Sequence, residues 1–501
     1  MSHEDVSALD VGVNLLDLGS PRDPTSLFGF EAVLAADERA ELSGEAELRA
    51  LRLAAEFVPA EFGGRFTRLD RLVEVGRELY RRDPALALAN AGGPFIASLL
   101  VWQAGDTAQR QRCADALLSG EWLAVAVTEL AHGNDLTAAE LSATRAEGGW
   151  ELHGRKELIT NAERADAMVV FARTDPAGGP RAHSLMWLDR GDEDSLVTLP
   201  RYGTDGVRGV KLGGFEFTGH LAPTDAVLGQ PGSGLEHLLK AFQVTRTSLP
   251  AMAVGVLDTA LRIAVEHLTE RTLYRGRAVD LPHVRAELVG AYRDLLTAEV
   301  VSAVGVRVLH LAPRAGSVSS AVVKFVVSGL LLSALDRVAD LLGAYSYLRE
   351  GPTGMVQKLL RDVRLVGFGH VARAACQMSL LPQLPLLAKR SWSKPPREVP
   401  GLFDVDGEIA PLRFDAFAVN ASGFDPVTST LHGTPELQDL AEVCSALPPS
   451  QLGVDAAPAH YDLTTRYAEL FTKACVLRVF GTETPHHQDD EQAFTNLLGR
   501  Y

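Results

Sequence analysis

The sequence has few cysteines and no long uninterrupted apolar run. Its four cysteines are far apart in 501 residues and form no Cys-x-x-Cys pair. This spacing argues against a disulfide scaffold and a thiolate zinc site, and it favours a reducing compartment. The longest apolar stretch, residues 321–335, is interrupted by Lys324 and is shorter than the roughly 20 residues that cross a bilayer. With an acidic N-terminus that lacks the apolar region of a signal peptide, we expect a cytoplasmic protein without a membrane span.

Positive charge is also in short supply. The chain has 48 Lys+Arg against 64 Asp+Glu, a formal net charge of −16. A general nucleic-acid binder needs a basic face that releases counterions, so this class is excluded. Any anionic ligand would need local basic residues against that global field, and two candidate clusters stand out: residues 201–211 (Arg201, Arg208, Lys211) and residues 389–397 (Lys389, Arg390, Lys394, Arg397).

The common catalytic signatures are absent. The sequence contains no P-loop, no G-x-S-x-G motif and no H-E-x-x-H motif. His486 and His487 precede the acidic residues 489–491, which together could be a metal cluster. Acidic residues after Pro485 fit an exposed helix N-terminus better, because carboxylates stabilise the positive end of the helix dipole. We therefore expect no metal.

Changes in residue composition and in hydrophobic periodicity divide the chain into four parts. Residues 1–121 are rich in helix-forming residues, 122–234 contain short β-rich runs, and 235–380 return to helical periodicity. Five prolines between Pro382 and Pro400 open the last part, 381–501, which we interpret as a Pro-rich linker and a helical extension.

Finer patterns predict individual elements within these parts. Residues 168–171 and 185–188 are typical of strands, and 283–312, 317–343 and 461–480 are typical of helices. The spacing of the long helices predicts an antiparallel bundle.

One ordered series of motifs rises above this background: Val58–Gly64, Gly120-Glu121, Val127–Glu129 with Gly133–Asp135, Gly154–Ala162 with Ala165-Asp166, Arg246, Arg271–Gly276, Leu342–Tyr347 and Arg361–Arg364. In residue type, order and spacing, the series resembles the acyl-CoA dehydrogenase family of flavoproteins over about residues 50–380. The resemblance implies a mainly α fold with a central β domain: an N-terminal helical domain, a middle β-barrel-like domain and a C-terminal four-helix bundle. The extension after Pro400 has no counterpart in the shortest members.

The resemblance also implies ligands and an assembly. It implies FAD between the β domain and the bundle, an acyl-CoA or acyl-carrier-protein substrate against the flavin, and a homodimer or homotetramer. The electron acceptor is not indicated.

Five residues of the middle part match the family's flavin contacts. The hydroxyls of Thr128 and Thr160 are implied at the polar edge of the flavin ring, and backbone donors at Gly133 and Asn134 at the pyrophosphate. Leu158 stands where the family has a tryptophan beside the flavin. Taken singly, these could be ordinary strand threonines and turn residues.

Five further residues match family positions in the segments that contact the cofactor bound mainly by a neighbouring subunit. Arg271 matches an arginine that pairs with the pyrophosphate, a task that suits a guanidinium fork, and Tyr274 lies in the same segment. Gly343 lets backbone approach the cofactor, whereas Asp340 and Ala344 replace a family glutamine and a second glycine. Arg271 alone could equally be a solvated helix charge.

The largest departure from the family is its missing base. Family members remove the substrate α-proton with a glutamate, and His370 stands at that position here. Other members carry the base beside the arginine matched by Arg246, where this chain has Thr245. We expect Arg246 and Thr245 beside the substrate, and both usual base positions lack a carboxylate.

Three interpretations follow. His370 could be the base of an α,β-dehydrogenase, because neutral imidazole with a pKa near 6.5 accepts protons at pH 7. Alternatively the flavin could serve a monooxygenase or N-hydroxylase, which abstracts no α-proton. In the third interpretation the chain is a catalytically silent, flavin-binding partner subunit. Independently of these, His370 could simply be a helix cap or a core residue.

Overall fold

The computed structural model describes residues 16–191, 194–481, 484–485 and 488–501. Packing divides them into two compact units, each assembled from separate stretches of chain. The sheet unit comprises Ala36–Thr67 and Ala85–Phe242, and the helix unit comprises Arg68–Pro84, Gln243–Tyr501 and the described residues up to Ala35. The division into four consecutive parts at residues 121, 234 and 380 stays a prediction.

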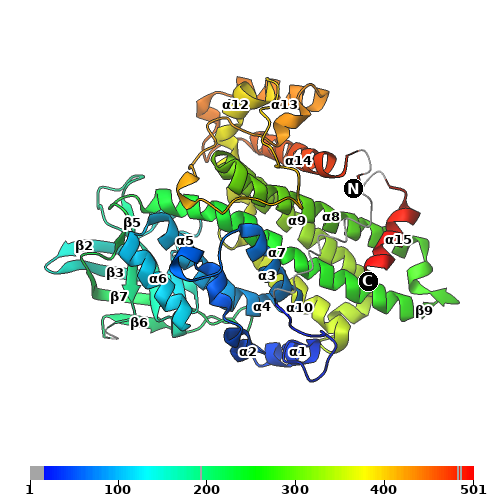
Figure 1. The fold of residues 1–501 in the computed structure, drawn as a ribbon, viewed down its shortest axis with the longest axis horizontal. Helices are drawn as coiled ribbons and strands as arrows, with labels where there is room; N and C mark the ends of the chain where they lie inside the picture. Colours follow the sequence, from blue (N-terminus) through cyan, green and yellow to red (C-terminus); the bar gives the residue numbers. More distant parts are fainter. Residues whose placement is uncertain (1–15, 192–193, 482–483, 486–487) are drawn as a thin grey trace. The chain divides into compact units, whose positions relative to one another are not determined.

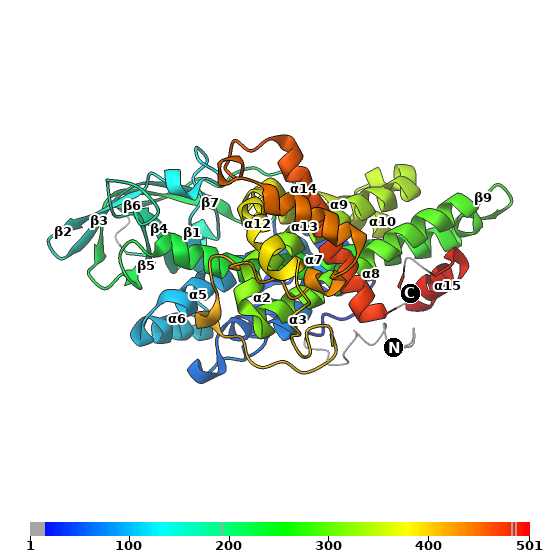
Figure 2. The ribbon, with the colours of Figure 1, turned by 90° about the horizontal axis from the view of Figure 1, so that it is seen from above.

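An eight-stranded sheet forms the centre of the sheet unit (Figures 1 and 2). The hydrogen-bonded order is β6-β7-β3-β2-β4-β5-β8, and β1 pairs with β4 in parallel. The strands are β1 Leu123–Ala126, β2 Ser142–Ala146, β3 Gly149–Thr160, β4 Ala167–Arg173, β5 His183–Asp189, β6 Leu196–Leu199, β7 Leu212–Pro223 and β8 Val227–Leu228. The predicted strands at 168–171 and 185–188 are therefore confirmed as parts of β4 and β5. Buried Met168, Phe215 and Phe217 belong to the apolar core of this unit.

Short helices complete the sheet unit. They are α2 Glu45–Ala50, η2 Leu53–Phe57, η3 Ala60–Phe62, η4 Leu88–Gly92, α5 Gly93–Ala104, α6 Thr107–Ser119, η5 Leu136–Ala138 and η6 Ala162–Arg164. Helix α5 is apolar and contacts β1. Helix α6 begins with a capping box, in which Asp106 and Gln109 satisfy each other's backbone N–H groups.

Long helices build the helix unit: α3 Leu69–Arg82, α7 Gly234–Glu270 (from Gln243 onward), α8 Pro282–Leu311, α9 Gly316–Leu342 and α10 Gly351–Phe368. The predicted helices at 283–312 and 317–343 are confirmed as α8 and α9. Gly305 lets α8 approach closely, because a Cβ there would lie 2.5 Å from Val323 of α9 and 3.4 Å from Thr247 of α7. A short hairpin of β9 Thr272–Leu273 and β10 Gly276–Arg277 joins α7 to α8 (Figure 1).

Among the described residues, three helical stretches are long and apolar enough to cross a membrane by length and composition, which corrects the expectation that none is. They are Pro84–Ala104, Gly234–Glu270 and Pro313–Tyr347. The apolar windows of these stretches are 100%, 94% and 67% buried within the fold. Their apolar character therefore serves packing inside the two units.

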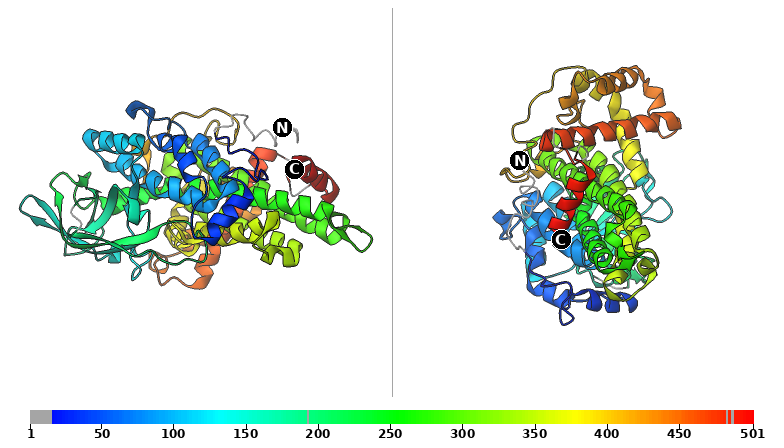
Figure 3. Two further views of the ribbon diagram at one scale, coloured as in Figure 1. Left: turned by 90° about the horizontal axis from the view of Figure 1, so that it is seen from below. Right: turned by 90° about the vertical axis from the view of Figure 1, so that its right-hand side faces the viewer.

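The C-terminal extension is part of the helix unit. Its elements are α11 Arg373–Leu380, η10 Leu381–Gln383, α12 Leu384–Leu387, η11 Ala388–Trp392, η12 Phe414–Ala416, η13 Thr428–Leu431, α13 Pro435–Ala446, η14 Pro449–Gln451, α14 Pro458–Phe480 and α15 Asp490–Arg500. Helix α14 contacts α8 and α9 (Figures 1 and 3). It confirms the helix predicted at 461–480.

The predicted linker at residues 382–400 is only half right. Residues 381–392 are helical, and Pro382 and Pro385 lie in the first turns of their helices, where the missing N–H costs no hydrogen bond. Irregular chain follows from Ser393.

The acidic residues near the C-terminus begin a helix, as expected. Asp489 caps α15 by accepting a hydrogen bond from the Gln492 N–H at 2.8 Å. Asp490 pairs with Arg293 of α8. His486 and His487 lie outside the described residues, and among the described residues no group of three His, Cys, Asp or Glu side chains could hold a metal.

Candidate functional site

In the sheet unit, the end of β1 lies beside the end of β3. The carbonyl of Thr128 accepts a hydrogen bond from the Glu157 N–H at 2.9 Å. The Glu157 carboxylate in turn accepts one from the Leu130 N–H at 3.2 Å. The structure therefore brings predicted residue Thr128 next to the segment that carries Leu158 and Thr160.

Leu158 sits on an irregularity of β3. The β3–β7 register shifts between Glu157 and Ile159, and Leu158 has a left-handed φ of 54°. Leu158 is 39% exposed, and Leu130 is 52% exposed. Two leucines thus leave apolar surface uncovered beside the hydroxyl-bearing residues Thr128 and Thr160.

A buried ion pair, which the sequence analysis missed, supports this corner. The Lys156 ammonium lies 2.7 Å from Glu129 and donates to the Val127 carbonyl at 3.1 Å. Burial lowers the pKa of Lys156, opposed by the Glu129 carboxylate. The sequence signal was present, because Glu129 and Lys156 lie inside the matched motifs and charged residues are almost never buried without a partner.

The predicted glycine turn is exposed. Gly133 has a φ of 54°, and its N–H donates to the Glu129 carbonyl at 2.9 Å. The Gly133 N–H is therefore engaged within the turn, Asn134 beside it is exposed, and the pyrophosphate contacts of both residues stay a prediction.

In the helix unit, the end of α7 meets the segment after α9. The Arg271 guanidinium lies 5.1 Å from the centre of the Tyr345 ring, and His267 lies 4.5 Å from it, ring to ring. This contact brings Arg271 together with η9, Gly343–Tyr347, which includes the predicted residue Ala344. The Asp340 carbonyl accepts a hydrogen bond from the Gly343 N–H that caps α9. Tyr274, also predicted, is 88% exposed on the hairpin.

Replacing Gly343 by alanine is expected to lower the free energy of unfolding by about 1–3 kcal/mol. Gly343 has φ 56° and ψ −129°, which L-residues avoid, while a Cβ there would meet nothing within 4 Å. The cost therefore comes from the backbone alone. Gly453→Ala is the control, since Gly453 is equally open but lacks the positive φ. Urea denaturation should show a loss only for Gly343→Ala, and equal stabilities would refute the strain.

The residue predicted at the family's base position, His370, lies in a tight turn between α10 and α11. His370 has φ 56° and Val371 has φ 105°, an uncommon conformation that is a true outlier for a β-branched residue. The turn is held from α9, because the Lys324 ammonium donates to the Gly369 carbonyl at 2.7 Å. Backbone strain of this kind concentrates at functional sites.

Two cations surround this turn. Burial, together with the charges of Lys324 and Arg246, lowers the pKa of His370 to about 3. Burial lowers the pKa of Lys324 to about 8, and it also lowers the pKa of Arg246. Burial raises the pKa of the Cys376 thiol, outweighing the attraction of these cations. His370 is therefore neutral at pH 7, in a strongly positive surrounding.

The structure thus joins two predicted residues, His370 and Arg246, and adds Lys324 and Cys376, which the sequence analysis did not assign to a site. Thr245, predicted beside the substrate, is fully buried on α7 next to Arg246. Lys324 was visible as the single charge that interrupts an apolar run, and a buried charge is itself a functional signal.

The burial of Lys324 predicts a pH-dependent stability. Its folded pKa of about 8 lies below the ordinary 10.5, so the unfolded chain binds more protons between these values. The contribution of Lys324 to the free energy of unfolding therefore rises with pH across that window, by about 3 kcal/mol. In Lys324→Met this rise is lost, so the stability difference, wild type minus variant, should grow by that amount. A difference that stays constant across the window in urea titrations would contradict the buried charge.

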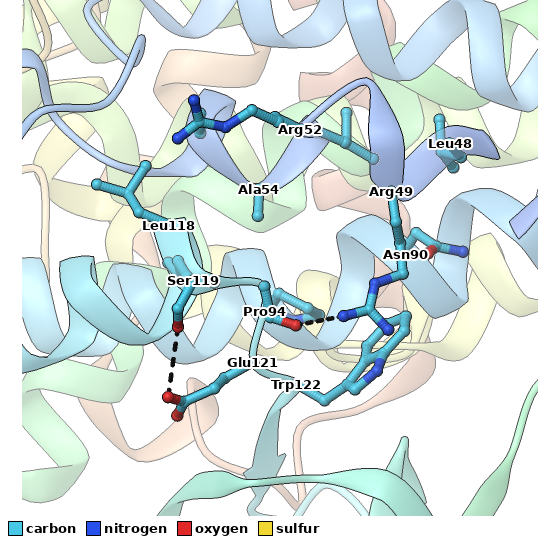
Figure 4. Close-up of a pocket in the computed structure, with 14 residues that line it drawn as sticks. Leu48, Arg49, Arg52, Ala54, Asn90, Pro94, Leu118, Ser119, Glu121 and Trp122 are labelled. Carbon is cyan, nitrogen blue, oxygen red and sulfur yellow. Dashed lines mark hydrogen bonds between the residues drawn. The ribbon is translucent and has the colours of Figure 1, made fainter. Parts of the chain in front are cut away.

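A separate cavity of about 310 Å³ lies in the sheet unit (Figure 4). The Arg49 guanidinium donates to the Gly120 carbonyl at 2.5 Å and lies 4.8 Å from the centre of the Trp122 ring, and Arg164 lies 3.5 Å from that centre. None of the predicted site residues lines this cavity. Of its lining residues, Arg49 and Trp122 are already engaged with one another.

Comparison with known proteins places these segments in one family. Residues 124–219 match the acyl-CoA dehydrogenase middle domain and residues 232–370 match the acyl-CoA dehydrogenase C-terminal domain. Mitochondrial isovaleryl-CoA dehydrogenase of Solanum tuberosum is 25% identical over 62% of this chain and 75% of its own length.

Solved structures share the fold. Butyryl-CoA dehydrogenase from Megasphaera elsdenii has a TM-score of 0.64 at 20% identity, covering 70% of this chain and 91% of its own. The prolyl acyl carrier protein oxidase AnaB has a TM-score of 0.61 at 17% identity, covering 75% and 96%. The predicted fold class is thereby confirmed. Through its matched middle and C-terminal domains, the chain belongs to the acyl-CoA dehydrogenase family of flavoproteins.

Proposed function

We propose that this chain is an FAD-dependent oxidoreductase that removes hydrogen from the α and β carbons of an acyl thioester. The observation that carries the proposal is the turn at the predicted base position, where the Lys324 ammonium contacts the Gly369 carbonyl and the charges of Lys324 and Arg246 help to keep His370 neutral. Family membership supports flavin-dependent dehydrogenation in general. The roles of the individual residues are part of the proposal.

The residues of the sheet unit fit a flavin. Leu130 and Leu158 leave apolar surface uncovered, which suits the flat faces of an isoalloxazine ring. Thr128 and Thr160 supply hydroxyls that can bond its polar edge. Asn134 is an exposed candidate for the pyrophosphate of this flavin. Arg271 of the helix unit, with a guanidinium suited to phosphate oxygens, is the candidate for the pyrophosphate of a neighbouring subunit's flavin.

The chemistry then divides between cofactor and protein. Bound FAD would supply the acceptor for a hydride from the β-carbon. An imidazole nitrogen of His370 accepts the α-proton. The neighbouring cations weaken His370 as a base, but they also stabilise the negative charge that develops on the substrate when the proton leaves. A weak base can therefore serve because the carbon acid is made stronger.

A flavin-dependent monooxygenase or N-hydroxylase is the second candidate. The observation that favours it is the same electrostatic surrounding, because Lys324 and Arg246 oppose the imidazolium that proton abstraction would create. Such a reaction abstracts no α-proton and needs no base at this position. The third candidate is a flavin-binding partner subunit that converts no substrate.

Anaerobic titration of the FAD-loaded protein separates these candidates. Bleaching of the flavin by an acyl-CoA or an acyl-carrier-protein thioester supports the dehydrogenase and identifies the carrier. Bleaching only by a nicotinamide donor supports the monooxygenase, and no bleaching by either supports the silent subunit. If the purified protein fails to bind added FAD, all three interpretations fail together.

We also propose that the chain works as a homodimer or homotetramer in the cytoplasm. Tyr274 and Tyr347 of the helix unit are 88% and 90% exposed, and large exposed aromatic side chains are typical of surfaces that a partner covers. All four cysteines are buried and unbridged, which fits a reducing compartment. Light scattering on the purified protein tests the assembly, and a monomer at micromolar concentration would refute it.

A further inference from the structure

A groove lies in the helix unit between the α8–α9 connection and two parts of the C-terminal extension. Its volume is about 740 Å³, within the range of small-molecule sites. Residues 311–314 form one side, and residues 390–400 and 421–429 form the others. Two of the three sides of the groove therefore belong to a part of the chain beyond the matched family domains, which end at residue 370, and residues 311–314 lie inside the matched C-terminal domain.

The groove is lined by more positive than negative side chains. Its cations are Arg314, Arg390, Lys394 and Arg397, all exposed, and its carboxylates are Glu398 and Asp425. Asp425 is buried, and its carboxylate accepts hydrogen bonds from the Trp392 indole at 2.9 Å and the Tyr467 hydroxyl at 3.1 Å. Within the described part of the chain, none of the four cations forms an ion pair.

This lack of pairing distinguishes the groove from the other basic cluster seen in the sequence. Arg208 pairs with Asp37, Lys211 lies 3.6 Å from Glu163, and Arg201 donates to the Ala40 carbonyl at 3.1 Å. Those charges are used within the sheet unit. In a chain with a net charge of −16, acidic partners are plentiful, so four cations left unpaired in one groove form a local positive field.

The walls of the groove are fixed before any ligand binds. The Arg390 guanidinium donates to the Ser422 carbonyl at 2.9 Å, and the Ser391 hydroxyl donates to the Gly423 carbonyl at 2.8 Å. The Asp425 N–H donates back to the Ser391 hydroxyl at 3.0 Å. A preformed wall reduces the entropy lost on binding.

We propose that this groove binds the phosphate groups of a nucleotide. Arginine forks and lysine ammonium groups are the side chains that bind phosphate oxygens most strongly. Leu311, Val399 and Phe424 give the groove an apolar wall for the uncharged part of such a ligand. The nucleotide end of coenzyme A and a free nucleotide share this chemistry.

Calorimetry on the intact protein tests the site with defined probes. Adenosine 3′,5′-bisphosphate and coenzyme A should bind, whereas pantetheine, which lacks phosphate, should not. The double variant Lys394→Ala, Arg397→Ala should weaken bisphosphate binding about tenfold or more, because charge-assisted hydrogen bonds are lost. Lys389→Ala is the matched control, since Lys389 is an exposed neighbour that does not line the groove, and its affinity should equal that of the wild type.

The outcomes separate the source of the nucleotide. If it is coenzyme A, the double variant raises KM for acyl-CoA but not for the phosphate-free acyl-pantetheine. If it is a free nucleotide, both KM values stay unchanged while bisphosphate binding is lost. The site is refuted if no phosphate-bearing probe binds at millimolar concentration, if the double variant binds as tightly as the control, or if only an acidic protein binds. Because the binding measurement needs no flavin chemistry, its failure is distinct from failure of the proposed reaction.

Discussion

Replacing Lys358 by methionine is expected to lower the free energy of unfolding by about 3–5 kcal/mol, a large share of the stability of an ordinary protein. The Lys358 ammonium lies 2.5 Å from Asp83 at the end of α3 and 2.5 Å from Asp362 on α10. All three side chains are at most 3% exposed. The variant therefore leaves two buried carboxylates without the cation that compensates their loss of hydration.

Two controls make this expectation specific. Lys473→Met removes the partner of Glu436 in an exposed pair, which should cost less than about 1 kcal/mol. Adding Asp83→Asn and Asp362→Asn to Lys358→Met removes the uncompensated charges and should restore much of the loss. If urea denaturation shows that Lys358→Met and Lys473→Met lower the free energy of unfolding by the same small amount, the buried ion pairs of Lys358 do not stabilise the fold as proposed.

Replacing His370 by asparagine is expected to slow reduction of the bound flavin by about 10²–10⁴-fold, the usual contribution of a general base. Asparagine is the right substitution because it tolerates the left-handed conformation that His370 adopts, so the turn is kept while the basic nitrogen is lost. Stopped-flow absorbance under anaerobic conditions measures the rate. FAD affinity and melting temperature should not change.

The pH dependence of this rate follows from the same surrounding. With its pKa lowered to about 3, His370 is neutral above that value, so the wild-type rate should show no inflection near the ordinary histidine pKa of 6.5. Activity lost to protonation of His370 would appear only as the pH falls toward 3. An inflection near 6.5 that vanishes in His370→Asn would contradict the lowering of the His370 pKa by burial and by the charges of Lys324 and Arg246. An unchanged rate in His370→Asn would remove His370 as the base.

The parts of the fold that could be predicted are those with strong local periodicity. Helices α8, α9 and α14 were placed within a few residues, because apolar residues recur along them at helical spacing. Strands β4 and β5 were placed by their runs of β-formers. The parallel pairing of β1 with β4 was not predictable, since no local signal records which distant strand a strand joins.

The linker between residues 382 and 400 shows the opposite limit. Proline was interpreted as a break, yet Pro382 and Pro385 begin helices, and only their position relative to the first turn decides between the two outcomes. The exact residue at which a helix begins depends on tertiary contacts, and the sequence pattern alone specifies it poorly.

The positions of site residues could be predicted where a family motif covers them. Their pKa values could not, because these depend on burial and on neighbours from distant parts of the chain. His370 and Arg246 were found by position, but the pKa of His370 depends on Lys324, which comes from α9 at a distance of 46 residues along the chain. The same holds for Lys156, whose partner Glu129 lies on another segment of the sheet unit. Electrostatics of this kind follow from packing, which only the structure provides.

The mass of the thioester after a single anaerobic turnover tests the central claim most directly. The FAD-loaded protein is mixed with a saturated acyl thioester in the absence of oxygen, and the product is measured by mass spectrometry. α,β-Dehydrogenation predicts a product lighter by one pair of hydrogens, formed in proportion to the flavin reduced. A thioester recovered unchanged beside oxidised flavin, with an oxygenated product appearing only when oxygen and a nicotinamide donor are supplied, would contradict it.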